Sequence, residues 1–203
     1  MRRIASLLGA MKARRPSRAL ACQSGMAAVE FALILPILVV LWIGGVEVTQ
    51  ALSVDRRLNN LASSIGDLTA RRKKLSIAQV TEIFDIAPGA MFPYSATGLQ
   101  MRLTAVAIDS DGNAKVDWSR ASGATPYAKN ASMNDLVPEN LRTAGGSASQ
   151  IIMSEVNYTY KPAVGYVITG DLDLEDRMFF VPRLTNTILL CTGLNPDVGC
   201  QPS

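Results

Sequence analysis

One segment limits the folds open to this chain more than any other. Residues 26–46, MAAVEFALILPILVVLWIGGV, contain a single ionisable side chain, that of Glu30. As an α-helix this segment is about 31 Å long, which matches the roughly 30 Å hydrocarbon core of a bilayer. The sequence therefore predicts a transmembrane helix, and Pro36 is where we expect it to kink. A carboxylate inside such a helix costs about 2.5–3.5 kcal/mol on insertion scales, so the position of Glu30 requires a physical explanation.

The charges of the chain are distributed unevenly around this segment. Residues 1–25 contain no acid, and their removal changes the formal net charge from +3 to −3. The cations of this basic leader are Arg2, Arg3, Lys12, Arg14, Arg15 and Arg18. The basic character therefore belongs to the leader and does not indicate a nucleic-acid partner. By the positive-inside rule we expect a cytoplasmic N-terminus and an exported domain over residues 47–203.

Three interpretations of the N-terminal region are open. The first is a secretory signal peptide cleaved near VTQALS, although the small-residue pattern there is poor. The second is an uncleaved signal anchor, in which Glu30 lies near the cytoplasmic boundary and is partly solvated. The third starts from the order of Gly25, Glu30 and Phe31, which resembles the cleavage site of type IV prepilins. By that resemblance a membrane peptidase would cut after Gly25 and leave Met26 as the new N-terminus.

Cleavage after Gly25 would also give Glu30 a counter-charge. The freed α-amine of Met26 is a cation, and it could pair with Glu30 of a neighbouring subunit staggered by about one turn. A paired charge tolerates an apolar environment better than an isolated one. Such pairing would also fix the axial register between subunits, a role known for other buried polar groups.

The wider sequence resembles the TadE-like domain of tight-adherence (Tad) pilus assembly proteins. The similarity lies in GMAAVEFALILPILVVLWIGGVEV running into ALSVDRRLNNLASSIGDLTAR, with a proline inside the apolar stretch and the acid Glu47 after a small-residue pair. The resemblance implies a minor pseudopilin of a Tad (type IVc-like) pilus system in a bacterial inner membrane, with its C-terminal domain periplasmic. The implied partners are a prepilin peptidase, other pilins or pseudopilins and the Tad assembly platform. The leader is longer than those of familiar prepilins.

Apolar residues recur every three or four positions after the membrane segment: Ala51, Val54, Leu58, Leu61, Ile65 and Leu68. This spacing predicts that the transmembrane helix continues as an amphipathic helix. We expect Leu58, Leu61 and Ile65 to pack against the chain's own sheet, with packing against a second pseudopilin as the alternative. Within the membrane segment, Phe31 and Pro36 are the expected packing positions.

The remaining residues predict an α+β fold of pilin-like type, in which this long helix packs on a small antiparallel β-sheet. We expect residues 47–88 to be helical, with Ser76 capping a second helix that ends at Pro88. Residues 98–203 are expected to be rich in strands, with a hairpin turn at DSDGNAK rather than a calcium loop.

The sequence also predicts the local structure of four further segments in the strand-rich region. Residues 121–149 predict a loop with one short helix at MNDLVPENLR. QIIMSEVNYTY predicts a half-buried strand with Ile152, Val156, Tyr158 and Tyr160 on its apolar face. DLDLEDRMFFVPRLT suggests acids that face solvent on an amphipathic turn, followed by residues 178–181, which insert or pair. TNTILLC suggests a last strand.

The cysteines and the absence of histidine limit the chemistry. Cys22 falls on the cytoplasmic side, whereas Cys191 and Cys200 could form a disulfide in an exported domain. Without histidine, most catalytic triads and zinc sites would need substitutes, so we expect no enzyme, metal, cofactor or small-molecule substrate. The alternative to a pseudopilin is an uncleaved, signal-anchored periplasmic binding or assembly-scaffold module.

Overall fold

A computed structural model describes residues 23–143, 149–162, 164–192 and 200. The chain divides into two compact units, Met1–Gly45 and Val46–Ser203. Each unit is described by itself. The expectations for the basic leader and for Cys22 lie outside the described residues.

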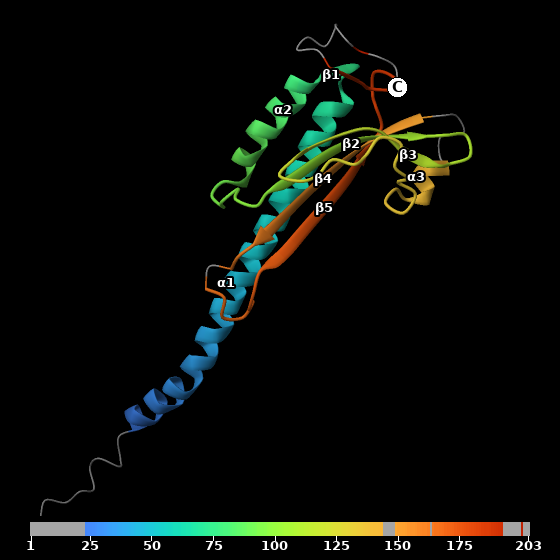
Figure 1. Ribbon diagram of the computed structural model, residues 1–203. Coiled ribbons are helices and arrows are strands. Elements are labelled where there is room, and N and C mark those ends of the chain that lie inside the picture. The colour runs from blue at the N-terminus through green and yellow to red at the C-terminus, as the bar shows by residue number, and fades with distance from the viewer. Residues whose placement is uncertain (1–22, 144–148, 163, 193–199, 201–203) are drawn as a thin grey trace, which may run out of the picture. The chain divides into compact units, whose positions relative to one another are not determined.

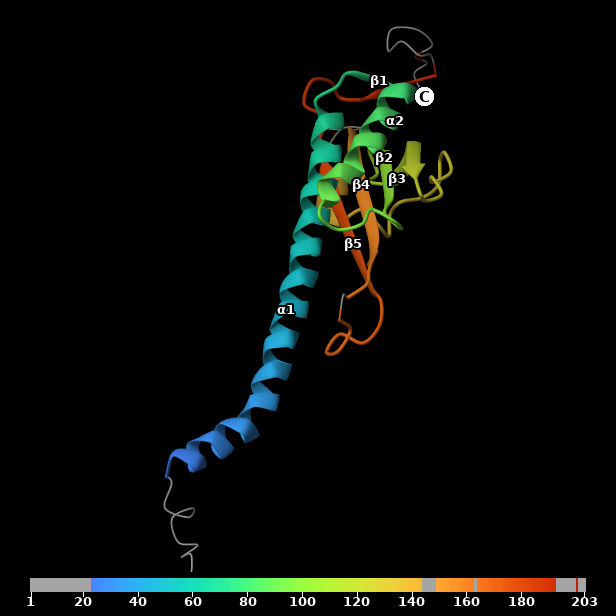
Figure 2. The same cartoon turned by 90° about the vertical axis from the view of Figure 1, so that its left-hand side faces the viewer.

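The first unit contains the N-terminal part of helix α1 (Gln23–Ala70), which Figure 1 shows in blue. From Gly25 onward this part exposes most of its apolar side chains, including Phe31 and Trp42. Pro36 lies inside the helix, and the blue part of α1 bends in Figure 2, as expected for an internal proline. Within the described residues, α1 is the one helix long and apolar enough to cross a membrane.

The second unit contains the rest of α1 and two sheets, which confirms the predicted α+β class (Figure 1). The larger sheet is antiparallel, with strand order β3-β2-β4-β5. Its strands are β2 (Gln100–Ile108), β3 (Ala114–Ser122), β4 (Ser149–Tyr160) and β5 (Leu172–Phe180). The smaller sheet pairs β1 (Lys74–Ser76) with β6 (Leu189–Cys191) in parallel. The remaining helical segments are α2 (Ile77–Ile86), the 3₁₀ turn η2 (Ala87–Met91) and α3 (Glu139–Thr143).

The apolar stripe of α1 forms the main core with one face of the larger sheet. Val54, Leu58, Leu61 and Ile65 are buried in one cluster with residues of β2, β3 and β4. Packing of this part of α1 against the chain's own sheet is therefore confirmed. Leu68, the last apolar residue of the stripe, lies outside this core, and its side chain is 48% exposed.

A second core covers the opposite face of the larger sheet. Ile151 and Met153 of β4 contact apolar residues of the segment between β3 and β4, including Met133 and Val137. The prediction of a half-buried β4 was therefore wrong for its first eight residues, which are nearly all buried. The apolar residues of this covering segment are few and follow no regular period among polar ones, which hid their role in the sequence. The expected short helix is present as α3.

Strand β5 corrects the expectation of an acidic turn. Residues 172–180 pair with β4 along their whole length, from Leu172 opposite Tyr160 to Phe180 opposite Ile152. Acids disfavour strands, which is why the sequence suggested a turn. Arg177 of β5 donates across the sheet to Glu155 of β4 at 2.9 Å, and along its own strand to Glu175 at 2.8 Å.

The end of α1 leads into α2 through a short strand. The hydroxyl of Ser76 accepts a hydrogen bond from the Gln79 N–H at 3.2 Å, and the Gln79 side chain accepts one from the Ser76 N–H at 3.0 Å. This capping box confirms the predicted start of the second helix. Strand β6 ends at Cys191, which forms a disulfide with Cys200.

Candidate functional site

The expected processing site lies at the start of α1. The peptide bond between Gly25 and Met26 lies in the first described turn of α1 (Gln23–Ala70). A Cβ atom built on Gly25 would meet nothing within 4 Å. The backbone at this bond is therefore open to approach from outside.

Glu30 lies on the exposed surface of the same helix. Its side chain forms no hydrogen bond or ion pair with any other described residue. Phe31 beside it is 59% exposed, and Pro36 is also exposed. The first unit thus brings the glycine, the carboxylate and the aromatic side chain onto one exposed helix end, but it provides no counter-charge for Glu30 among the described residues.

A second carboxylate, Glu47, has the opposite environment. Its side chain is 1% exposed although it lies two residues after the end of the first unit. Its oxygens accept hydrogen bonds from the backbone N–H groups of Tyr166 at 2.9 Å, Val167 at 2.9 Å and Ile168 at 2.8 Å. Glu47 therefore holds the loop between β4 and β5 against α1.

These hydrogen bonds set the protonation of Glu47. The N–H groups of Ile168 and Tyr166 lower the pKa of the Glu47 carboxyl below its ordinary value, and their effect outweighs the opposing effect of desolvation. Hydrogen bonds to the charged form of a carboxyl group always act in this direction. The side chain is consequently an anion at neutral pH, and the loop backbone supplies its donors.

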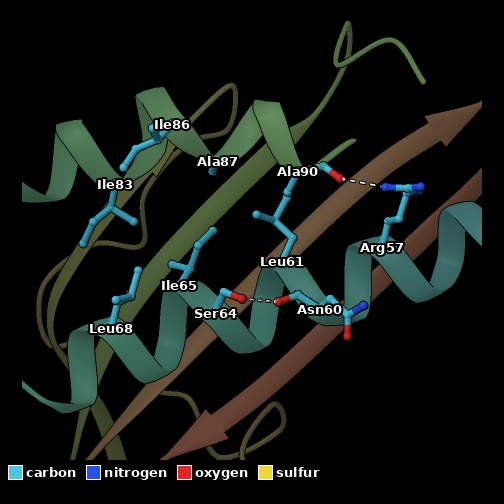
Figure 3. A pocket seen from close by; sticks show the side chains of 10 residues that line it. All are labelled: Arg57, Asn60, Leu61, Ser64, Ile65, Leu68, Ile83, Ile86, Ala87 and Ala90. Carbon is cyan, nitrogen blue, oxygen red and sulfur yellow. Dashed lines mark hydrogen bonds between the residues drawn. The ribbon is translucent and has the colours of Figure 1, made fainter. Parts of the chain in front are cut away.

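An apolar groove runs between α1 and α2, which lie side by side in Figure 1 and Figure 2. Figure 3 shows Leu61, Ile65 and Leu68 of α1 facing Ile83 and Ile86 of α2. The groove has a volume of about 280 Å³. At one end the Arg57 guanidinium donates to the carbonyl oxygen of Ala90 at 3.3 Å, which ties η2 to α1.

Gly66 marks the closest approach of α1 to the larger sheet. A Cβ atom at this position would overlap the ring of Phe180 in β5. The glycine therefore lets the helix lie directly on the aromatic ring, and Phe180 packs against the main core.

The sequence was compared with models of protein families. The sequence model described as TadE-like protein matches residues 25–66. This segment is TadE-like. The resemblance expected from the sequence is thus confirmed over these residues. A search of curated proteins and a search of solved structures each gave no match.

The TadE-like segment starts at Gly25 and ends at Gly66. It contains the candidate membrane helix, Glu30, Glu47 and most of the buried stripe of α1. Residues 67–203, which include every strand of the larger sheet, lie outside the match.

These sites could be predicted from the sequence only in part. Gly25, Met26 and Glu30 were singled out by their spacing, whereas the contact of Glu47 with residues 166–168 was missed. An acid directly after an apolar helix was visible, but its partners lie about 120 residues away. Backbone donors leave no side-chain signature, so the sequence offered no signal for that pairing.

Proposed function

We propose that this chain is a minor, pilin-like component of a Tad pilus system. Residues 26–46 anchor it in the bacterial inner membrane, with the N-terminus cytoplasmic and the domain of residues 47–203 in the periplasm. A prepilin peptidase removes the basic leader after Gly25. The mature subunit then associates with other pilins or pseudopilins and with the assembly platform, either at the base of the fibre or within it.

One observation carries this proposal above the others. The TadE-like match begins at Gly25, the residue after which cleavage is proposed, and it continues through the candidate membrane helix. A generic signal anchor requires only length and hydrophobicity, and it has no reason to place a glycine and a carboxylate at these two positions.

Glu30 acts in this proposal as the charge that aligns subunits. Its carboxylate is exposed on the apolar helix and has no partner among the described residues, so a second chain is free to supply one. The amine of Met26, released by cleavage, lies one turn away along the helix and has the required charge. Pairing offsets the cost of burying each ion.

A charge-neutral variant tests this function. Glu30→Gln keeps the shape of the side chain and lowers the cost of membrane insertion, so we expect normal membrane levels but loss of pili in cells that depend on this chain. Glu82→Gln, which removes an exposed acid of α2, is the matched control and should leave piliation unchanged. Normal piliation with Glu30→Gln would favour the uncleaved, signal-anchored scaffold instead.

A further inference from the structure

The loop between β4 and β5 exposes apolar side chains. Val164, Tyr166 and Val167 lie largely in solvent, and the Tyr166 side chain is 61% exposed. Ile168, by contrast, packs against the main core and fixes the end of the loop. We call Val164, Tyr166 and Val167 the apolar tip.

The apolar tip lies beside α1 at the first residues of the second unit (Figure 1). Here α1 also exposes apolar side chains, those of Val46 and Val48, on both sides of Glu47. Val46 is the last residue of the candidate membrane segment. The hydrogen bonds of Glu47 to the loop therefore place the apolar tip within one side-chain length of the point where α1 leaves the hydrocarbon.

The backbone of this loop is adapted to an environment with little water. A backbone N–H group that leaves water needs another hydrogen-bond partner, because an unsatisfied donor costs free energy in an apolar environment. The N–H groups of Tyr166, Val167 and Ile168 are all satisfied by the Glu47 carboxylate. The same contact also stabilises the buried Glu47 carboxylate in its charged form.

From this arrangement we infer that the apolar tip inserts into the outer boundary of the bilayer that α1 crosses. Tyr166 occupies the headgroup level that aromatic residues prefer, and Val164 and Val167 contact the upper acyl chains. Amphipathic elements of this kind reach about 5–10 Å into the headgroup and acyl boundary. Glu47 is the positioning residue, because it holds the loop in place without touching lipid. The inference rests on the proposed membrane anchor.

Site-specific fluorescence in vesicles tests this inference. The full chain with Cys22→Ser would carry a single new cysteine at Tyr166, labelled with the environment-sensitive dye NBD and reconstituted in phosphatidylcholine vesicles. Val167→Cys is a second labelling position, and Ala128→Cys, exposed in the segment after β3, is the control. The disulfide between Cys191 and Cys200 does not react with the maleimide dye while it stays oxidised.

We expect the dye at positions 166 and 167 to emit at shorter wavelength than the dye at 128. It should also be quenched several-fold more strongly by phosphatidylcholine that carries a doxyl group high on its acyl chain. Adding Glu47→Ala should remove most of this difference while the circular-dichroism spectrum stays unchanged. An unchanged difference in that variant would refute the role assigned to Glu47.

A further labelling position, Leu35→Cys, lies in the proposed membrane anchor. It shows whether a negative result concerns the apolar tip alone or the anchor as well. Quenching at 35 with a water-like signal at 166 and 167 would overturn lipid contact but leave the membrane anchor intact. No quenching at 35 would overturn the anchor and the inference together. The dye at position 166 could become shielded from water only after other pilus subunits are added. That result would assign the apolar tip to a protein partner and also overturn the inference.

Discussion

At the scale of single residues, the two glutamates of the TadE-like segment have different roles. Glu30 is exposed and has no partner among the described residues, which suits a contact between chains. Glu47 is buried and fully paired within its own chain. The two acids lie on the same helix, so the difference arises from what surrounds each of them and not from helix position alone.

The pairing of Glu47 predicts a pH-dependent stability. Its pKa is lower in the folded chain than the ordinary 4.5, so its stabilising effect is complete above that pH and is lost as pH falls through the folded value. We expect Glu47→Gln to lower the Tm at pH 7 and to have a shrinking effect as the pH drops below about 4.5. Thermal unfolding of the full chain in detergent between pH 3 and pH 7 measures this, with Glu82→Gln as control. A Tm difference that does not change with pH would contradict the role of the charge.

The close packing at Gly66 predicts that a larger side chain there will destabilise the fold. In Gly66→Ala the new methyl group overlaps the Phe180 ring. Such overpacking typically costs about 1–3 kcal/mol, against about 1 kcal/mol gained from the better helix propensity of alanine. We expect a net loss of unfolding free energy of up to about 2 kcal/mol by denaturant titration. Gly89→Ala, where a Cβ meets nothing within 4 Å, is the control, and equal stability of the two variants would contradict this packing.

At the scale of elements, α1 passes through two environments. Its first part exposes apolar side chains on all sides, whereas its last part buries one stripe against the sheet. Spacing of three and four residues identified that stripe correctly up to Ile65. At Leu68 the side chain lines the open groove toward α2 and not the main core.

Because burial differs along the stripe, shortening its leucines to alanine should lower the unfolding free energy by unequal amounts. Leu61 is 3% exposed, so Leu61→Ala should reduce the unfolding free energy by about 2–5 kcal/mol. Leu68→Ala removes the same atoms from a half-exposed position and should cost less than about 1 kcal/mol. Parallel denaturant titrations compare the two variants. Similar losses for both would show that the groove is closed in solution.

At the scale of the whole molecule, the sequence predicted elements better than their contacts. The long helix, the capped α2, the β2–β3 hairpin and β4 follow from periodicity, capping and turn residues, which are local signals. The second core and the hydrogen bonds of Glu47 depend on residues distant in sequence, so local patterns could not reveal them. The acidic half of β5 was missed because pairing with β4 and the cross-strand ion pair of Arg177 with Glu155 overcame the low strand preference of its acids.

The central claim is that the chain matures by cleavage after Gly25 into a subunit whose new amine meets Glu30. Intact mass and N-terminal sequencing of the protein isolated from membranes of cells with an active prepilin peptidase test it most directly. The account predicts a chain that starts at Met26 and lacks all of the leader's cations. A chain that still starts at Met1, or one cut near Leu52 as by a secretory signal peptidase, would contradict it.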